Sequence, residues 1–305
     1  MAAVFSKDSS PADIHKWLAS AKCADWASSQ RSPAELVYFD GRGLADQIRF
    51  MLEFTCTPYT EVDVDEQDDF AALKASGDLA FGQVPLLRID GMKLVQTLAI
   101  MKHIARRKSL HGETATVQAK ADMVVLSILE ARKPLSFAPF TDDRVKTLAD
   151  FGAKTLPPLL CYLEDLLASA GGPFVAGNSL TYADCSLFEL LTYSRDELAS
   201  VTDATLEGNP HVAAHFALMG KLPHMVEYLG SRRRKPVPEE AWVRQICKTV
   251  GFPEPAYLSP KSDRTLSRAT AVSAVLAATV VVSALALAKT AWGRKLRARL
   301  MASLL

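Results

Sequence analysis

The sequence is poor in cysteine, and its cysteines are not arranged for metal or redox chemistry. Five cysteines are scattered along 305 residues, and no two of them form a Cys-x-x-Cys pair. The six histidines likewise lack a spacing typical of metal ligands. The pattern argues against a zinc ribbon and against thioredoxin-type redox chemistry, and it predicts no metal site. Dispersed, unpaired cysteines are typical of reduced thiols in a cytosolic protein.

Motifs for nucleotide binding and signals for export are missing as well. The sequence has no glycine-rich phosphate loop and no dinucleotide fingerprint, so it gives no support for nucleotide binding. The N-terminus lacks the apolar core of a secretory signal peptide. We therefore expect a protein that is not exported, and we expect no nucleic-acid partner.

The net charge is close to zero because two regions of opposite charge offset one another. The chain has a formal charge of +1, whereas residues 231–305 alone hold 14 Lys and Arg against 4 Asp and Glu. The preceding part is therefore acidic and the C-terminal part basic. The basic part begins with the run at 232–235. This run could lie against anionic lipid headgroups, or it could be an ordinary solvated run of charge.

Residues 34–110 have the pattern of a small α/β domain. Short apolar runs predict strands, runs with one apolar side predict helices, and Asp90-Gly91 is a strong signal for a tight hairpin. The expected strands are 35–39, 59–64, 85–89 and 93–95, with helices after the first strand and at 97–108. The order β-α-β, hairpin, α is that of a thioredoxin-like domain.

Within this domain, the stretch Phe81-Gly82-Gln83-Val84-Pro85 has the features of a clamp for an extended ligand. A proline beside a strand edge, whose preceding bond can be cis, leaves main-chain groups free to pair with another peptide. Gln96 and Thr97 open the next helix and offer an amide, a hydroxyl and free main-chain N–H groups to a carboxylate. The sequence thus predicts a small, extended ligand with an anionic end.

Residues 115–235 read as an all-α domain. Several amphipathic segments follow one another, separated by proline and glycine. Thr181-Tyr182-Ala183-Asp184 is a capping box, in which Thr181 caps a helix and Asp184 bonds back to it. Such a box contributes about 1 kcal/mol to helix stability.

The glycine turn at 38–43, the clamp and the capping segment at 172–184 together resemble the cytosolic glutathione transferase family. The resemblance covers about residues 34–235 and is nearest to the sigma, prostaglandin D synthase-like class. It implies a thioredoxin-like domain at 34–110 and an all-α domain at 115–235. It also implies glutathione as co-substrate, a hydrophobic electrophile as second substrate, and a homodimer.

The resemblance gives Tyr38, at the end of the first strand, a catalytic role. Glutathione attacks electrophiles as a thiolate, and a phenol that donates a hydrogen bond to sulfur favours the charged form. The alternative for Tyr38 is an ordinary core tyrosine. The same resemblance implies that Gln83, Val84 and Pro85 hold the cysteinyl main chain of glutathione. Gln96 with Thr97 would then hold its γ-glutamyl end.

Three further positions bear on glutathione binding. Lys74 matches a lysine that contacts the glycyl carboxylate in sigma-class enzymes, and its alternative is a solvated helix charge. Phe70 stands where many classes have a tryptophan that donates a hydrogen bond to glutathione, which phenylalanine cannot do. Leu44 stands where prostaglandin D synthase-like members have an arginine. These departures predict weak glutathione binding, or a relative of glutathione as ligand.

Residues 269–288 form a run of 20 residues without a charge. As a helix the run would span roughly 30 Å, the thickness of a bilayer core. The alternative is a buried or interfacial helix. We expect a transmembrane helix that acts as a C-terminal tail anchor, with the enzyme facing the cytosol. The mitochondrial outer membrane or the peroxisome is favoured, and the endoplasmic reticulum is possible.

The remaining segments would then be appendages. Residues 1–33 form an extension with a short helix at 14–21, residues 236–268 a basic linker, and residues 289–305 a short basic tail. A competing hypothesis is a non-catalytic, glutathione-transferase-like adaptor of an organelle membrane, favoured by Leu44 and Phe70 and opposed by Tyr38. A third is a glutathione-dependent prostaglandin or lipid isomerase, or a peroxidase.

Overall fold

A computed structural model describes residues 5–6, 8–20 and 33–259. Its four-stranded sheet has the order β2-β1-β3-β4. Strand β1 is parallel to β2 and antiparallel to β3, and β3 is antiparallel to β4. The strands are β1 (Ala34–Tyr38), β2 (Tyr59–Asp63), β3 (Leu86–Ile89) and β4 (Met92–Val95). The predicted β-α-β unit followed by a hairpin is confirmed.

The hairpin between β3 and β4 turns at Asp90-Gly91, as predicted. Both residues have positive φ angles, 54° and 75°, which is the geometry of a type I′ turn. Ile89 and Met92, on either side of the turn, are paired. This tight turn fixes the register of the strand that follows the clamp, and therefore the place where β4 ends and the next helix begins.

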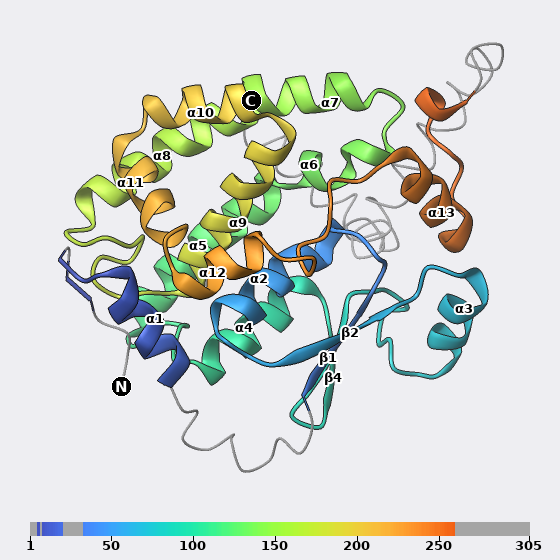
Figure 1. Ribbon diagram of the computed structural model, residues 1–305, viewed down its shortest axis with the longest axis horizontal. Coiled ribbons are helices and arrows are strands. Elements are labelled where there is room, and N and C mark those ends of the chain that lie inside the picture. The colour runs from blue at the N-terminus through green and yellow to red at the C-terminus, as the bar shows by residue number, and fades with distance from the viewer. Residues whose placement is uncertain (1–4, 7, 21–32, 260–305) are drawn as a thin grey trace, which may run out of the picture.

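Helices lie on both sides of the sheet (Figure 1). Helices α2 (Asp46–Phe54) and α4 (Thr97–Arg107) are on one side and α3 (Gln67–Ala75) is on the other. Every residue of α2 is buried, because α2 lies between the sheet and the second domain, where it packs against α4 and α9 (Tyr182–Glu197). The N-terminal domain is thus thioredoxin-like, as predicted.

The second domain is helical, as predicted. Its central helix α9 is buried from Tyr182 to Ser194 and begins with the expected capping box between Thr181 and Asp184. The other helices are α5 (Ala115–Ala131), α6 (Lys133–Phe137), α7 (Arg144–Asp150), α8 (Leu156–Ser169), α10 (Ala199–Glu207), α11 (Pro210–Met219) and α12 (Pro223–Leu229).

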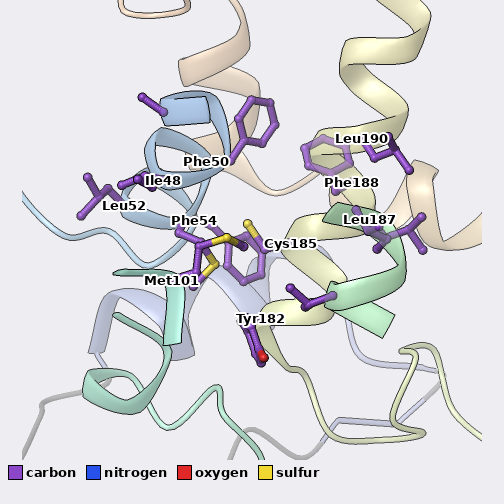
Figure 2. Packing of buried hydrophobic residues seen from close by; sticks show 14 of the residues in the cluster. Ile48, Phe50, Leu52, Phe54, Met101, Tyr182, Cys185, Leu187, Phe188 and Leu190 are labelled. Carbon is purple, nitrogen blue, oxygen red and sulfur yellow. The ribbon is translucent and has the colours of Figure 1, made fainter. Parts of the chain in front are cut away.

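The two domains share one hydrophobic core. Phe50 of α2 lies 6.0 Å from the ring of Phe188 in α9 and 5.5 Å from that of Tyr228 in α12. Figure 2 shows Phe50 of α2 and Phe188 of α9 on facing helices, with Met101 and Cys185 below them. Aromatic pairs at such distances contribute about 0.5–1.5 kcal/mol beyond the area they bury. The glycine turn that precedes α2 is therefore held firmly by both domains.

The N-terminal extension contains the short helix that the sequence predicts. It is α1 (Pro11–Ser20), and it buries Ile14 and Leu18. Ahead of it, Phe5 packs edge-on against Trp17 and Phe174. The extension is therefore part of the folded body over its described residues.

The predicted basic linker needs correction. Its described part, residues 236–259, contains α13 (Glu240–Val250) and a 3₁₀ turn, η4 (Ala256–Leu258). Arg234, just before it, is neither solvated nor available to lipid: its side chain is 8% exposed and pairs with Asp46 and Asp196. The linker prediction did not foresee α13, whose apolar residues Val243, Ile246 and Cys247 are buried.

No helix within residues 5–6, 8–20 and 33–259 is long and apolar enough to cross a membrane. The predicted transmembrane run at 269–288 and the basic tail at 289–305 lie outside the described residues.

Candidate active site

Tyr38 ends β1 with its hydroxyl pointing into the glycine turn that follows. The main-chain N–H of Leu44 donates a hydrogen bond of 3.0 Å to the Tyr38 oxygen. The side chain is only 8% exposed, yet it lines a cavity of about 160 Å³. One lone pair of the phenol oxygen is thus occupied, and its O–H remains available to a ligand in the cavity.

Gly43 makes this arrangement possible. Its φ is +41°, a left-handed conformation that side chains disfavour. A Cβ atom at this position would also overlap the Tyr38 hydroxyl. Glycine is therefore required here for two reasons, its backbone conformation and its close approach to the phenol.

The electrostatic surroundings keep Tyr38 protonated. Burial raises the pKa of the phenol above its ordinary value of 10.0, and it outweighs the opposing effects of the Leu44 N–H, Arg49 and Arg132. Tyr38 is therefore a neutral hydrogen-bond donor at physiological pH.

Arg132, at the end of α5, links the helical domain to the glycine turn. Its guanidinium lies 2.6 Å from Glu189 of α9 and donates a hydrogen bond of 3.1 Å to the main-chain oxygen of Gly43. Both charged side chains are buried. Sequence reasoning missed Arg132, and no local signal could have found it, because Glu189 is 57 and Gly43 is 89 residues away.

Asp46, at the start of α2, is a second charged group beneath the turn. It is fully buried and pairs with Arg234 at 3.0 Å. Burial alone would raise the pKa of this carboxyl, but Arg234, Arg42 and Arg49 together hold it below its ordinary value. The C-terminal basic run therefore contributes directly to the structure around Tyr38.

The clamp residues come together at one end of the sheet. The Val84–Pro85 peptide bond is cis, and Val84 has no main-chain hydrogen bond to another described residue. Gln96 has a φ of 74°, an uncommon conformation for a residue other than glycine that clusters at functional sites. Its amide donates to the Gln83 side-chain oxygen at 3.3 Å.

Thr97 joins the clamp to the glycine turn. Its hydroxyl donates a hydrogen bond of 3.2 Å to the main-chain oxygen of Leu44, the residue whose N–H reaches Tyr38. The structure therefore brings Tyr38, Gln83, Val84, Gln96 and Thr97 into one connected region, with the first turn of α4 beside them.

Phe70 and Lys74 lie on α3, across the sheet from α4. Phe70 is 6% exposed and packs edge-on against Phe39 at 5.6 Å. The Lys74 ammonium sits 4.2 Å above the Phe70 ring. Among the described residues, neither side chain has a hydrogen bond or a ring contact with the clamp. Their predicted roles in glutathione binding stay predictions.

The cavity beside Tyr38 is apolar and is closed by the C-terminal part of the described chain. Phe137 and Phe140 form one wall, and Trp242 of α13 with Phe252 forms another. The Trp242 ring covers Gly41 so closely that a side chain at that glycine would collide with it. Sequence reasoning missed this wall because it assigned residues 236–268 to a linker.

Comparisons with known proteins agree with this architecture. Residues 34–106 match the family model described as glutathione S-transferase, N-terminal domain, and residues 129–232 match glutathione S-transferase, C-terminal domain. Glutathione S-transferase alpha-5 of Rattus norvegicus is 33% identical over 217 residues, covering 70% of this chain and 96% of that protein. Glutathione S-transferase 3 of Gallus gallus is 31% identical, covering 70% and 93%.

A solved structure agrees as well. The pi-class glutathione S-transferase of Onchocerca volvulus superposes with a TM-score of 0.59 at 26% identity, covering 68% of this chain and 98% of that one. The predicted sigma-like class finds no support in these names, which are of the alpha and pi classes. The family itself is shown by both domain matches and by the length of the aligned relatives: the chain belongs to the glutathione S-transferase family of enzymes.

Proposed function

We propose that this protein conjugates the thiolate of glutathione to hydrophobic electrophiles. The observation that carries the proposal is the Tyr38 hydroxyl, which lines the cavity and already accepts a hydrogen bond from Leu44. Its remaining O–H can donate to a sulfur atom, and that bond would favour the thiolate over the thiol.

The energy required is within reach of one such bond. A free thiol has a pKa of about 8.5, and lowering it to about 6.5 requires about 2.7 kcal/mol. Hydrogen bonds to charged groups contribute about 1.5–3 kcal/mol. The nearby Arg132 and Arg49 guanidinium groups act on Tyr38, and positive charge there would also favour a thiolate.

The clamp fits the rest of glutathione. The free main-chain groups of Val84 would pair with the cysteinyl residue, as a strand edge pairs with an extended peptide. Gln96, Thr97 and the N-terminus of α4 would bind the γ-glutamyl carboxylate, because a helix N-terminus attracts anions. The exposed ammonium of Lys74 would meet the glycyl carboxylate at the other end.

The second substrate would occupy the apolar cavity. Phe140 and Trp242 pack against each other at 5.8 Å, and both face the space beside the Tyr38 hydroxyl. Such a pocket favours an electrophile that is itself apolar or aromatic.

The test compares the full-length protein with Tyr38→Phe. Glutathione binding is followed by calorimetry, and conjugation to a generic aromatic electrophile is followed by absorbance. We expect the variant to keep glutathione binding and to lose roughly 10²–10³ in kcat. Tyr162→Phe, which removes a hydroxyl from an exposed tyrosine of α8, is the matched control. Equal turnover by the wild type and Tyr38→Phe would refute the assignment.

A second candidate is a non-catalytic adaptor with the same fold. It is favoured by Phe70, which is buried and has no hydrogen-bond donor, and by Leu44 in place of a basic residue. In that case the same assay would give neither glutathione binding nor turnover. A sigma-like class, and the isomerase or peroxidase activity on lipids that it would imply, stay predictions. Turnover of a lipid hydroperoxide or endoperoxide without conjugation would favour them.

We also propose that the protein forms a homodimer. Phe81, in the loop that carries the clamp, is 68% exposed, and Met123 and Leu126 on α5 are exposed as well. Contiguous patches of exposed apolar side chains mark interaction sites, and Met123 and Leu126 are neighbours on one face of α5. Phe81→Ser and Leu126→Ser should each shift the protein toward the monomer in light scattering. Val145→Ser, at an exposed position of α7, should not.

Finally, we propose that residues 269–288 anchor the protein in a membrane. The support is the uncharged length of this run and the basic residues on both sides of it. Introducing Leu276→Arg together with Val281→Arg should release the full-length protein from membranes after an alkaline wash, because each arginine at a bilayer centre costs about 2.5–3.5 kcal/mol. Val145→Arg is the control. Which organelle carries the protein would be read from its co-fractionation.

A further inference from the structure

Three side chains from distant parts of the chain meet where α1 contacts the rest of the molecule. His15 belongs to α1, Cys56 follows α2, and His224 belongs to α12. The Nδ1 atoms of the two histidines are 2.6 Å apart, and one ligand atom from each of the three residues lies within 4.8 Å of the others. His15 and His224 are 209 residues apart in sequence, which is why ligand spacing gave no indication of this group.

The two imidazole rings are already arranged to share a ligand. They stack with their centroids 4.8 Å apart and their planes 25° from parallel. Without an ion, two facing nitrogens must share a proton, because a neutral ring has one donor and one acceptor. Two nitrogens bound to a tetrahedral Zn²⁺ lie roughly 3.3 Å apart. After a small rotation of either ring, the two nitrogens would be far enough apart to bind one metal ion in place of the shared proton.

Cys56 is presented to the histidines by an unusual backbone. The N–H of Cys56 bonds to the oxygen of Glu53, and that of Thr57 bonds to the oxygen of Leu52. This is a Schellman ending of α2, and Cys56 occupies its left-handed position with a φ of 48°. Glycine is the residue that this position favours. A cysteine there disfavours the turn, and it places a thiol against both histidines.

The group is open to solvent on one side. A pocket of about 310 Å³ is lined by Cys56 and His224, together with Glu53, Tyr59 and Arg233. The pocket leaves room for an ion to enter and for a water molecule to complete its coordination.

We propose that His15, Cys56 and His224 form a zinc site that fastens α1 to the body of the protein. Two imidazoles and one thiolate suit Zn²⁺, which is borderline-soft and takes four ligands. The ion would add a bond between α1 and two elements of the transferase fold, where apolar contacts such as those of Ile14 and Leu18 already hold it. This proposal differs from the sequence-based prediction of no metal site, and it does not depend on the proposed catalytic function.

The first test measures zinc on the full-length, reduced protein after treatment with a chelator. Zinc alone is added back, and its affinity is measured by competition with a chromogenic chelator. We expect one tightly bound zinc per chain, and cobalt in its place should give a thiolate charge-transfer band. His15→Ala should weaken binding at least about tenfold. Cys56→Gly should abolish the band while retaining the fold, because glycine suits the left-handed position.

Matched controls separate this site from incidental binding. His211→Ala and Cys161→Ser alter an exposed histidine and an exposed cysteine elsewhere, and they should leave zinc affinity unchanged. Zinc should also slow amide hydrogen exchange in α1 of the wild type and not of His15→Ala. Stoichiometric zinc that survives in both His15→Ala and Cys56→Gly, or no tight zinc in the wild type, would overturn the proposal. His224→Ala tests the third ligand if that variant folds. If it does not fold, His15→Ala and Cys56→Gly are sufficient to test the proposal.

Discussion

Leu44 is bonded through its main chain to both halves of the candidate site. Its N–H donates to the Tyr38 hydroxyl at 3.0 Å, and its carbonyl accepts from the Thr97 hydroxyl at 3.2 Å. Thr97 begins α4, the helix whose N-terminus would bind the γ-glutamyl carboxylate. The main chain of Leu44 therefore connects the N-terminus of α4 to the Tyr38 phenol, and this connection does not depend on the side chain at position 44.

Replacing Thr97 by valine should weaken this connection. The variant keeps the shape of the side chain but removes the hydroxyl that bonds to Leu44. We expect the free energy of unfolding to fall by about 0.5–1.5 kcal/mol, and kcat to fall together with glutathione affinity. Thr97→Ser keeps the hydroxyl and should behave like the wild type. Denaturant melts and steady-state kinetics would measure both effects, and equal behaviour of the two variants would contradict the role given to the hydroxyl.

Gly43→Ala should damage both stability and turnover. The new Cβ would meet the Tyr38 hydroxyl, and it would stand at a left-handed φ of +41°. Gly91→Ala is the matched control, because Gly91 is also left-handed, with a φ of +75°, but has open space around it. We expect about 1 kcal/mol of destabilisation from the backbone in both variants, and a further loss with reduced kcat only at Gly43. Urea unfolding curves and steady-state kinetics of the two variants would measure these losses of stability and of kcat.

The raised pKa of Tyr38 predicts how the protein responds to alkaline pH. In the folded protein the phenol holds its proton above its ordinary pKa, whereas the unfolded chain releases it near pH 10. The stabilisation is therefore complete below about pH 10 and is lost as the pH rises through the folded-state pKa. Denaturant melts should give a smaller alkaline loss in Tyr38→Phe than in the wild type, and kcat should not fall between about pH 8 and 10. Tyrosinate absorbance of the folded protein that rises at Tyr38 near pH 9 would contradict this.

Replacing only Arg132 of the buried Arg132–Glu189 ion pair should lower the free energy of unfolding more than replacing both residues. Arg132→Met leaves a buried carboxylate without its partner, and we expect a loss of about 3–5 kcal/mol in unfolding free energy. Adding Glu189→Met should recover most of that loss. Turnover should stay low in the double variant, because the hydrogen bond to the Gly43 oxygen is absent. Arg195→Met breaks an exposed pair with Asp203 and should cost less than about 1 kcal/mol.

Trp242→Ala should act on the second substrate alone. The indole forms part of the cavity wall, and an apolar electrophile would lose contact area in the variant. We expect KM for the electrophile to rise roughly tenfold, while KM for glutathione stays unchanged. The two KM values from one set of rate measurements provide the comparison. A change confined to the KM for glutathione would place the tryptophan at the other end of the site.

Local patterns predicted those parts of the structure whose causes are local. Asp90-Gly91 specified the hairpin because a type I′ turn needs positive φ at both residues. Thr181 and Asp184 specified the start of α9 because a capping box spans four residues. Gln96 and Thr97 were correctly placed at the start of α4 because that helix follows directly from the hairpin register.

The remainder depended on contacts between distant segments. Arg132 reaches Gly43 only because α5 and α2 pack on the same central helix, and Trp242 covers Gly41 from a segment that reads as a linker. Arg234 and Lys235, in the run at 232–235, were misread for a similar reason, whereas Arg232 and Arg233 are exposed. A solvated run of charges and a run with residues paired inside the fold can have the same composition. Here the difference comes from Asp46 and Asp196, which pair with Arg234.

The wall formed by α13 and residues 252–255 has a consequence for the order in which the site is completed during synthesis. Proteins are made from the N-terminus, so Tyr38 leaves the ribosome long before Trp242 and Phe252. Until those residues follow, the cavity lacks the apolar side chains of Trp242 and Phe252, and Asp46 lacks the positive charge of Arg234. A chain that stops short of α13 would therefore contain every residue of the clamp and still lack part of the cavity lining, so the complete cavity forms only after α13 and residues 252–255 have been made.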